Sequence, residues 1–413
     1  MSRTSHISRR AFLRTTLLSG LTLGAGLGAF EGARRGLQLL DLHDTWEAAG
    51  APNDVFLARH ARLLDGLELG GSFAPEQWSM DNAPSTEVLR ALDVAIADLD
   101  LRRLRLGIRW NRAVDENGRV DLSVYAPYIE RCLSQGVEVC LNVGPIRTFR
   151  WPEEHVPIEV LTALESRPRV ETAVRPEDPL AQAALSYLDE LLVVLRREYG
   201  TSFATIQAEN EPFYPLGGHL WTMSRPYMRQ VVEHIDSVFP EASILMTSAG
   251  RLNLHAVRDV FSDLLARPDN RFAGRLVSGF DYHYKTPTRD AMPIVRYFDQ
   301  IAYARPFAPS LEGHRRDART LGFGMEITEA QMEPYGHFSE PGNSAKHLRF
   351  LLLRTTDRVF EHTASSKLMR LWGVEELTMK MAAGTLTDEH RQMIELIQTV
   401  NASAHDAPSV LAD

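Results

Sequence analysis

The chain has 413 residues, of which 44% are hydrophobic, and these values are typical of a globular protein with one large core. They exclude a fibrous or a disordered chain. A formal net charge of -9, without a basic stripe that carries interleaved aromatic residues, argues against nucleic acid as a partner.

Residues 1–30 resemble a twin-arginine export signal. Arg9 and Arg10 are followed by Phe12 and Leu13, and the run TTLLSGLTLGAGLGAF comes next. That run is too short and too rich in glycine to span a membrane. The resemblance implies export of the folded chain by the twin-arginine machinery of a bacterium or archaeon, to the periplasm or the extracellular space. The alternative is a basic amphipathic leader that stays attached.

We expect residues 31–60 to form a linker or an N-terminal arm, and residues 61–405 to form one catalytic domain. In that domain β-rich runs alternate with amphipathic helical runs, a pattern that predicts parallel strands with helices outside. The predicted strands are 67–75, 101–111, 137–145, 203–212, 242–250, 276–285, 323–331 and 367–376. The clearest helical runs are 86–99, 124–136, 181–200 and 388–403.

Eight such units in one chain predict a (β/α)₈ TIM barrel. The rival fold is an open doubly wound sheet, but no glycine-rich G-x-G-x-x-G loop follows the first strand. The longest irregular stretch, 146–179, follows the third strand, so we expect it to shape the barrel mouth. Gln77, Trp78 and Trp151 are candidate subsite residues there, with rim packing as the alternative.

The two cysteines, Cys132 and Cys140, lie in a helical run and in a strand. Two cysteines cannot form a disulfide framework. We expect packed thiols, and a single bridge between them is the alternative.

Two acidic clusters lie at strand ends, where TIM barrels carry their reactive groups. The fourth strand ends in Glu209 and Glu211, and the seventh in Glu326 and Glu329. Two carboxylates across a barrel mouth can flank the anomeric carbon of a sugar, one as acid and base and the other as nucleophile. Their position nearer the strand ends favours Glu211 and Glu329, whereas a surface or salt-bridged glutamate is the alternative for each.

Three motifs resemble those of the family-one β-glucosidases, which belong to the large clan of retaining glycoside hydrolases built on (β/α)₈ barrels. They are N-E-P at 210–212, I-T-E at 327–329, and RLGIRWNR at 105–112, which is similar to R-F-S-I-S-W-P-R. The resemblance implies that Glu211 is the acid/base and Glu329 the nucleophile. It also implies that Arg105 keeps Glu329 ionised, because an adjacent cation lowers the pKa of a carboxylate.

The chain departs from that family in two places. Ala330 and Gln331 replace its N-G after the nucleophile, and Asn142-Val143-Gly144-Pro145 replaces its His-Trp on the third strand. The sixth strand, with His283 and Tyr284, is closer to the cellulase and mannanase branch of the clan. The motifs therefore indicate the clan, but they do not identify a substrate.

Four further residues are candidates for substrate binding. The resemblance implies that Asn210 binds the sugar 2-hydroxyl. His283 and Tyr284 alternate along the strand, so one of them is expected to face the barrel bore, with core packing as the alternative. Trp372, near the end of the eighth strand, is a candidate stacking floor for a sugar ring, with a core tryptophan as the alternative.

The expected function is therefore retaining hydrolysis of an O-glycosidic bond in a glycoside, oligosaccharide or polysaccharide, without a metal or cofactor. The retaining mechanism predicts carboxyl groups of Glu211 and Glu329 about 5 to 5.5 Å apart, and inversion requires roughly 6.5 to 9.5 Å. One alternative is a metal-dependent hydrolase or isomerase that uses Glu211, His283 and Glu329. The other is a carbohydrate-binding barrel without catalysis.

Overall fold

The computed structural model describes residues 41, 44–77, 85–150, 154–164, 166, 168–251, 253–283, 311–332, 344–360 and 367–405. The predicted leader at 1–30 lies outside these ranges. Trp78, Trp151 and Tyr284 also lie outside them, as does the side chain of Gln77.

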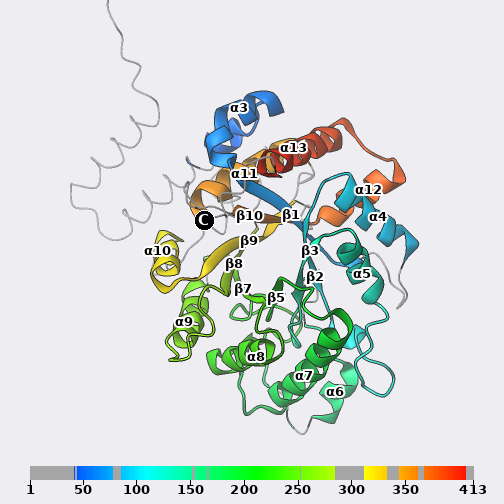
Figure 1. Cartoon of the computed structure of the whole chain (residues 1–413), viewed down its shortest axis with the longest axis vertical. Helices are drawn as coiled ribbons and strands as arrows, with labels where there is room; N and C mark the ends of the chain where they lie inside the picture. The colour runs from blue at the N-terminus through cyan, green and yellow to red at the C-terminus, as the bar shows by residue number, and fades with distance from the viewer. Residues whose placement is uncertain are drawn as a thin grey trace, which may run out of the picture.

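Eight parallel strands close into a barrel in the order β1-β10-β9-β8-β7-β5-β3-β2 (Figure 1). This confirms the predicted (β/α)₈ fold. The strands are β1 (Leu67–Phe73), β2 (Arg103–Gly107), β3 (Glu138–Asn142), β5 (Thr205–Gln207), β7 (Ser243–Ala249), β8 (Leu276–Tyr282), β9 (Gly324–Gln331) and β10 (Lys367–Trp372). Most are shorter than predicted, and β5 occupies only three residues in the first half of the predicted run 203–212. The strand ends that carry the acidic clusters therefore lead quickly into loops.

Helices surround the barrel, as the alternation predicts (Figure 1). They are α4 (Thr86–Ala97), α5 (Ala126–Ser134), α6 (Ile158–Ala163), α7 (Pro179–Tyr199), α8 (Arg225–Val238), α9 (Leu254–Leu265), α10 (Leu311–Leu321), α11 (Ala345–Val359), α12 (Val374–Ala383) and α13 (Asp388–His405).

Helix α7 shows why these segments fold against the strands. It begins with a proline at its first position, where the missing N–H costs no hydrogen bond. Leu180, Ala184, Leu188, Leu191 and Leu195 recur every three or four residues, and all are buried. They form one apolar face that packs on the barrel.

Two segments differ from their predicted structure. The predicted eighth strand, 367–376, ends at Trp372, because Gly373 adopts a φ of 90° and α12 begins directly after it. The predicted irregular stretch 146–179 contains α6 and the short strand β4 (Ala173–Val174), which pairs with β6 (Thr222–Met223). This small parallel pair joins the loop after β3 to the loop after β5.

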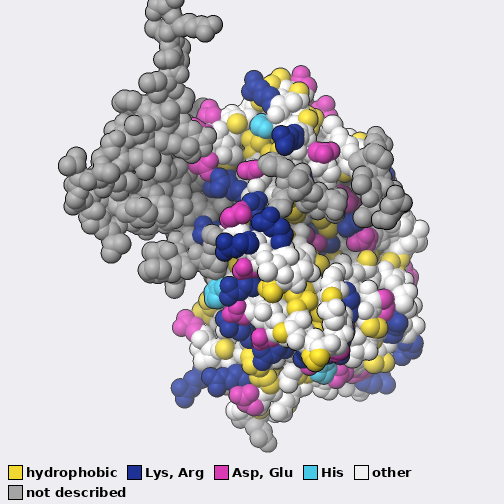
Figure 2. All heavy atoms as spheres, turned by 60° about the vertical axis from the view of Figure 1, so that its left-hand side comes forward, with side chains coloured by type: hydrophobic (Ala, Val, Ile, Leu, Met, Phe, Trp, Pro, Cys, Tyr) yellow, Lys and Arg dark blue, Asp and Glu magenta, His cyan; other side chains and the backbone are white. Residues whose placement is uncertain are grey.

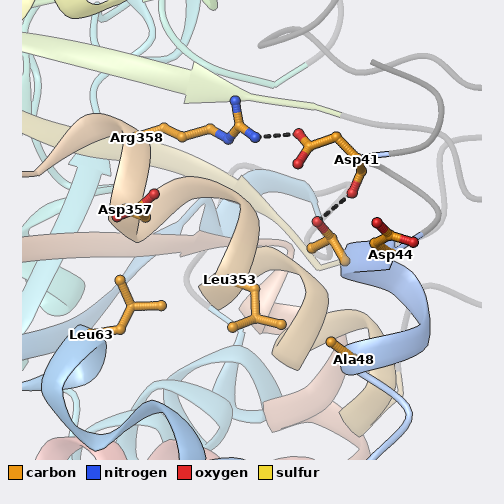
Figure 3. A pocket seen from close by; sticks show the side chains of 8 residues that line it. Asp41, Asp44, Ala48, Leu63, Leu353, Asp357 and Arg358 are labelled. Atoms are coloured by element: carbon orange, nitrogen blue, oxygen red, sulfur yellow. Dashed lines mark hydrogen bonds and ion pairs between the residues drawn. The ribbon is translucent and has the colours of Figure 1, made fainter. Parts of the chain in front are cut away.

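The described part of the N-terminal region, which includes α3 (Asn53–Leu64), lies against α11. Trp46 contacts Phe350 edge to face with centroids 5.6 Å apart, and buried Arg354 pairs with Asp41 at 2.5 Å. A pocket of about 410 Å³ lies between this region and α11. Figure 3 shows Asp41 turned toward Arg358 across the pocket. None of the candidate catalytic residues lines it.

The outer helices are linked by ion pairs between neighbours. Arg229 of α8 pairs with Asp263 of α9, and Arg258 of α9 pairs with Asp317 of α10 at 3.5 Å. Figure 2 shows basic and acidic side chains interspersed on this side of the molecule. Exposed pairs of this kind each stabilise a fold by about 0 to 1 kcal/mol. In the described part of the chain, no helix is long and apolar enough to cross a membrane.

Candidate active site

The side chain of Arg105, from β2, lies at the centre of a buried hydrogen-bond network inside the barrel. Its Nη1 donates to Oε1 of Glu329 at 2.7 Å, and its Nη2 donates to Oδ1 of Asn210 at 2.7 Å. Its Nε donates to Oε1 of Gln207 at 2.6 Å. Arg105 is 0% exposed and Glu329 is 4% exposed. Three of the predicted site residues therefore meet in one buried cluster.

Glu329 is surrounded by groups that stabilise its charge. Burial alone would raise its pKa, but the charge of Arg105 and a hydrogen bond with His283 lower that pKa to about 2. Nε2 of His283 lies 3.1 Å from Oε2 of Glu329, so each carboxylate oxygen has a partner. These contacts therefore favour the ionised form of Glu329.

An irregularity in β9 positions this carboxylate. Between Ile327 and Glu329 the pairing with β8 skips one residue, and the pairing with β10 also shifts there. A bulge of this kind inserts one residue and redirects the side chains that follow it. Thr328, the inserted residue, donates a hydrogen bond to Asp281. The bulge thus lets β9 direct Glu329 toward Arg105 of β2.

Glu211 lies four residues beyond the end of β5, in a strained backbone conformation. Its φ is 42°, a region that residues other than glycine rarely adopt. Two contacts hold it: its N–H donates to Oγ1 of Thr247 at 2.8 Å, and its carbonyl accepts from Nη1 of Arg147 at 2.9 Å. Strain held by surrounding contacts is typical of functional positions.

Arg147 and Thr247 hold the backbone of Glu211, and sequence reasoning missed both. Arg147 is fully buried and also donates to the carbonyls of Tyr214, Leu216 and Trp221, so it organises the whole loop after β5. Nothing in its sequence context distinguishes it from a surface arginine. Thr247 had only a weak signal, since its strand also contains the polar residues Ser243 and Ser248.

Glu209, one of the two competing glutamates, anchors the loop after β3. It accepts hydrogen bonds from the backbone N–H of Ile146 at 3.2 Å and of Arg147 at 2.7 Å, and from the hydroxyl of Tyr227 at 3.1 Å. Burial raises its pKa to about 7. A side chain at Gly144 would come within 2.6 Å of the Glu209 carboxylate, so only glycine fits beside it.

Glu326, the other competitor, forms a buried ion pair with Arg370 of β10. The charge of Arg370 lowers the pKa of Cys140 on β3, although burial dominates and raises that pKa to about 12. Arg370 is 1% exposed and Glu326 is 7% exposed, so the pair is buried. The charge of Glu326 is balanced by Arg370, whereas Arg105 pairs with Glu329.

Trp372 lies at the end of β10, and other side chains approach it closely. The guanidinium carbon of Arg150 lies 4.2 Å from the centroid of its ring, and His283 meets the ring edge to face with centroids 5.2 Å apart. His283 therefore contacts both Glu329 and Trp372. Part of the surface that we predicted as a stacking floor is already covered by Arg150.

Cys132 and Cys140 are buried and free, so they form no disulfide bridge. Burial raises the pKa of each thiol to about 12, as expected for packed thiols. Among the residues that the structure describes, no group of three or more His, Cys, Asp or Glu side chains is arranged to hold a metal ion.

No protein-family model matches the chain, and no curated protein matches it. Among solved structures, an exo-β-1,4-mannosidase from Opitutaceae bacterium strain TAV5 aligns with a TM-score of 0.51 at 16% identity, over 82% of this chain and 60% of that one. A broad-specificity GH5-4 endoglucanase from Clostridium longisporum aligns with a TM-score of 0.48 at 11% identity, over 82% and 97%. A xyloglucan-specific β-1,4-glucanase from a ruminal metagenomic library gives 0.48 at 14%, over 83% and 96%. At such identities the likeness shows the shared barrel fold alone.

Proposed function

We propose that this chain is a retaining glycoside hydrolase that cleaves a β-linked O-glycosidic bond, with Glu329 as nucleophile and Glu211 as acid/base. The observation that carries this proposal is the buried contact of Arg105 with Glu329, which holds a carboxylate ionised at the end of a barrel strand. A nucleophile must be charged to attack. The (β/α)₈ solved structures that resemble the chain, whose names include a mannosidase and glucanases, add support from the same fold.

The reaction has two displacement steps. A carboxylate oxygen of Glu329 attacks the anomeric carbon, and the bond to the leaving-group oxygen breaks as Glu211 donates its proton to that oxygen. Glu211, now a carboxylate, removes a proton from a water molecule. That water attacks the anomeric carbon, and the bond to Glu329 breaks. Two inversions give net retention of configuration.

Asn210 is positioned to hold the sugar during both steps. Its Oδ1 accepts from Arg105 at 2.7 Å and from Thr247 at 3.2 Å, and its amide NH₂ is a hydrogen-bond donor. We assign that donor to the 2-hydroxyl of the sugar bound next to Glu329, a bond that strengthens in the transition state. His283 orients the second oxygen of Glu329.

We also propose that the chain is exported by the twin-arginine route. Arg9 and Arg10 are assigned to a twin-arginine signal, which directs the folded enzyme to the periplasm or beyond. Replacing both arginines with lysine should leave the protein in the cytoplasmic fraction, as measured by immunoblot of fractionated cells. Unchanged export of that variant would refute the assignment.

The test of the function is a screen of aryl β-glycosides and common polysaccharides, with and without a chelator. We expect hydrolysis that a chelator does not reduce, with a first-formed product of β configuration by NMR. Activity that collapses in chelator would favour a metal-dependent barrel, and an α product would show inversion. Carbohydrate binding without turnover would indicate a non-catalytic barrel. A crystal structure should place the two carboxyl groups about 5 to 5.5 Å apart.

A further inference from the structure

The loop after β3 runs along the rim of the barrel mouth and contacts residues on opposite sides of it. At one end Arg147 holds the loop after β5 through the carbonyls of Glu211 and Tyr214. Three residues later, Arg150 reaches β10, where its guanidinium lies over the ring of Trp372. Strands β5 and β10 are four places apart in a ring of eight, so they face each other across the barrel.

The path of the loop can be followed along the rim strand by strand. The ring of Phe149 lies 3.0 Å from the place where a side chain at Gly107 would begin, at the end of β2. Oε1 of Glu375 accepts from the N–H of Ala74, directly after β1, at 2.7 Å. Its other oxygen accepts from Nη2 of Arg150 at 2.6 Å. The ends of β2, β1 and β10 are thus joined by one continuous set of contacts.

These side chains fill their sector of the rim. We call Phe149, Arg150, Trp372 and Glu375 the rim stop. Phe149 is 2% exposed, Arg150 4%, Trp372 8% and Glu375 0%. An open groove running outward over β10 would leave its lining side chains exposed. Here Arg150 packs on Trp372 and pairs with Glu375, and the neighbouring Phe149 lies against Arg105 of β2.

The backbone of Arg150 supplies a second, independent observation. Its φ is 79°, in the left-handed region that favours glycine. An arginine persists in such a conformation only where its contacts outweigh the strain, and strain of this kind clusters at functional positions. The stacking on Trp372 and the ion pair with Glu375 are the contacts that hold it.

The position of the rim stop relative to the proposed acid/base determines which part of the substrate it meets. Glu211 protonates the leaving group, so the leaving group lies on the β5 side of the mouth. The glycone is transferred to Glu329 on β9, and a glycone that extends away from β5 runs toward the opposite strand, β10. A glycan with several sugars on the glycone side would run into the rim stop.

We propose that the rim stop, with Arg150 as its central residue, restricts the site to the non-reducing end of a glycan, so that the enzyme releases one terminal sugar at a time. This inference rests on the proposed hydrolase function. Arg150 is a specificity-determining residue, and it takes no part in bond cleavage.

The test compares 4-nitrophenyl β-glucoside, β-mannoside and β-xyloside with the matching 4-nitrophenyl β-1,4-biosides. The natural enzyme should release nitrophenol from a monoglycoside at once. From the bioside it should first release a single sugar, with nitrophenol following after a lag. An intact disaccharide released within tenfold of the monosaccharide rate would overturn the inference. If no glycoside is cleaved at all, the hydrolase proposal itself fails, and the inference with it.

Variants sharpen the test. Arg150→Gly combined with Glu375→Gln removes the guanidinium, suits the positive φ, and keeps an acceptor for Ala74 without leaving a buried charge unpaired. We expect direct nitrophenol release from the bioside, relative to the monoglycoside, to rise at least tenfold. Asn270→Gly, at another positive φ of 50° on the exposed surface, is the control and should leave that ratio unchanged. A folded double variant with the natural ratio would also overturn the inference.

Discussion

A buried carboxylate follows the end of β5 and another lies near the end of β9, and the pKa values of the two are shifted in opposite directions. Glu209, after β5, accepts from two backbone amides and one tyrosine hydroxyl, and burial raises its pKa to about 7. Burial also acts to raise the pKa of Glu329 on β9, but there the cation of Arg105 and the bond with His283 lower it to about 2. With comparable burial, the direct ion pair with Arg105 and the contact with His283 offset burial at Glu329, whereas the charge of Arg147 and the three donors do not offset it at Glu209.

This difference separates two roles. Two backbone amides and a hydroxyl hold Glu209, and together with the charge of Arg147 they do not offset the effect of burial on its pKa. One of these amides is that of Arg147, so Glu209 is tied to the backbone that carries that arginine. Arg147 in turn holds Glu211 in its strained conformation. Glu209 therefore supports the proposed acid/base through the loop, whereas Arg105 acts directly on the proposed nucleophile.

The largest expected effect is that of Glu329→Gly. If Glu329 is the nucleophile, kcat for an aryl glycoside should fall by a factor of about 10⁴ or more, because no covalent intermediate can form. Azide or formate should enter the space left by the side chain and restore turnover, with azide giving an α-glycosyl azide. Glu326→Gln is the comparison, since its carboxylate already pairs with Arg370. Residual natural activity in Glu329→Gly would mean that the nucleophile is another residue.

The next largest effect is that of Glu211→Ala, and it should depend on the leaving group. Loss of a general acid costs about 10²- to 10⁴-fold when the leaving group needs a proton. The leaving group of a dinitrophenyl glycoside needs no proton. For that substrate the rate of the first step, in which Glu329 displaces the leaving group, should fall much less. A uniform loss across leaving groups in pre-steady-state kinetics would contradict the role of acid.

Arg105 can be tested through the pH profile. In Arg105→Gln, burial of Glu329 remains but its cation is gone, so the pKa of the carboxylate should rise. The acid limb of kcat/KM should then move to higher pH, and activity near pH 5 should fall more than activity near pH 7. Arg105→Lys keeps the positive charge but loses the hydrogen bonds that arginine donates to Gln207 and Asn210. It should therefore lose activity, but its acid limb should move less than that of Arg105→Gln. Equal acid limbs in both variants would show that Arg105 does not set the charge state of Glu329.

How far the sequence predicts this site depends on whether contacts are local or distant. Apolar strand runs and amphipathic helices repeat along the chain, and they predict all eight barrel strands. The motifs around Arg105, Asn210 and Glu329 lie on those strands, so barrel closure brings them together. Local patterns were sufficient for this part of the site.

The loop contacts could not be predicted in the same way. Arg147 and Arg150 follow β3 without any periodic pattern, and their partners lie 64 and 225 residues away in the chain. Glu375 was placed at the end of a predicted strand, but the positive φ of Gly373 starts a helix there and buries the carboxylate below Arg150. Which loop residues meet depends on the closed barrel, and no local signal encodes that.

The smallest expected effect is that of Glu209→Gln, which tests the other half of the comparison. All three partners of Glu209 donate, so the amide NH₂ of glutamine would face a donor and cost about 1 to 3 kcal/mol of stability. Because the folded-state pKa of Glu209 is raised from 4.5 to about 7, the associated stability is complete below about pH 4.5 and is lost as the pH rises through 7.

Urea unfolding at pH 5 and pH 8 measures how much the free energy of unfolding changes as Glu209 ionises. The natural protein should lose more stability between the two values than Glu209→Gln does, since glutamine does not titrate. Glu177→Gln, at an exposed glutamate whose side chain is 69% accessible, is the matched control and should follow the natural protein. If Glu209→Gln shows the same loss as the natural protein, Glu209 is already ionised at pH 5. Its three donors would then outweigh burial, as the cation of Arg105 does for Glu329.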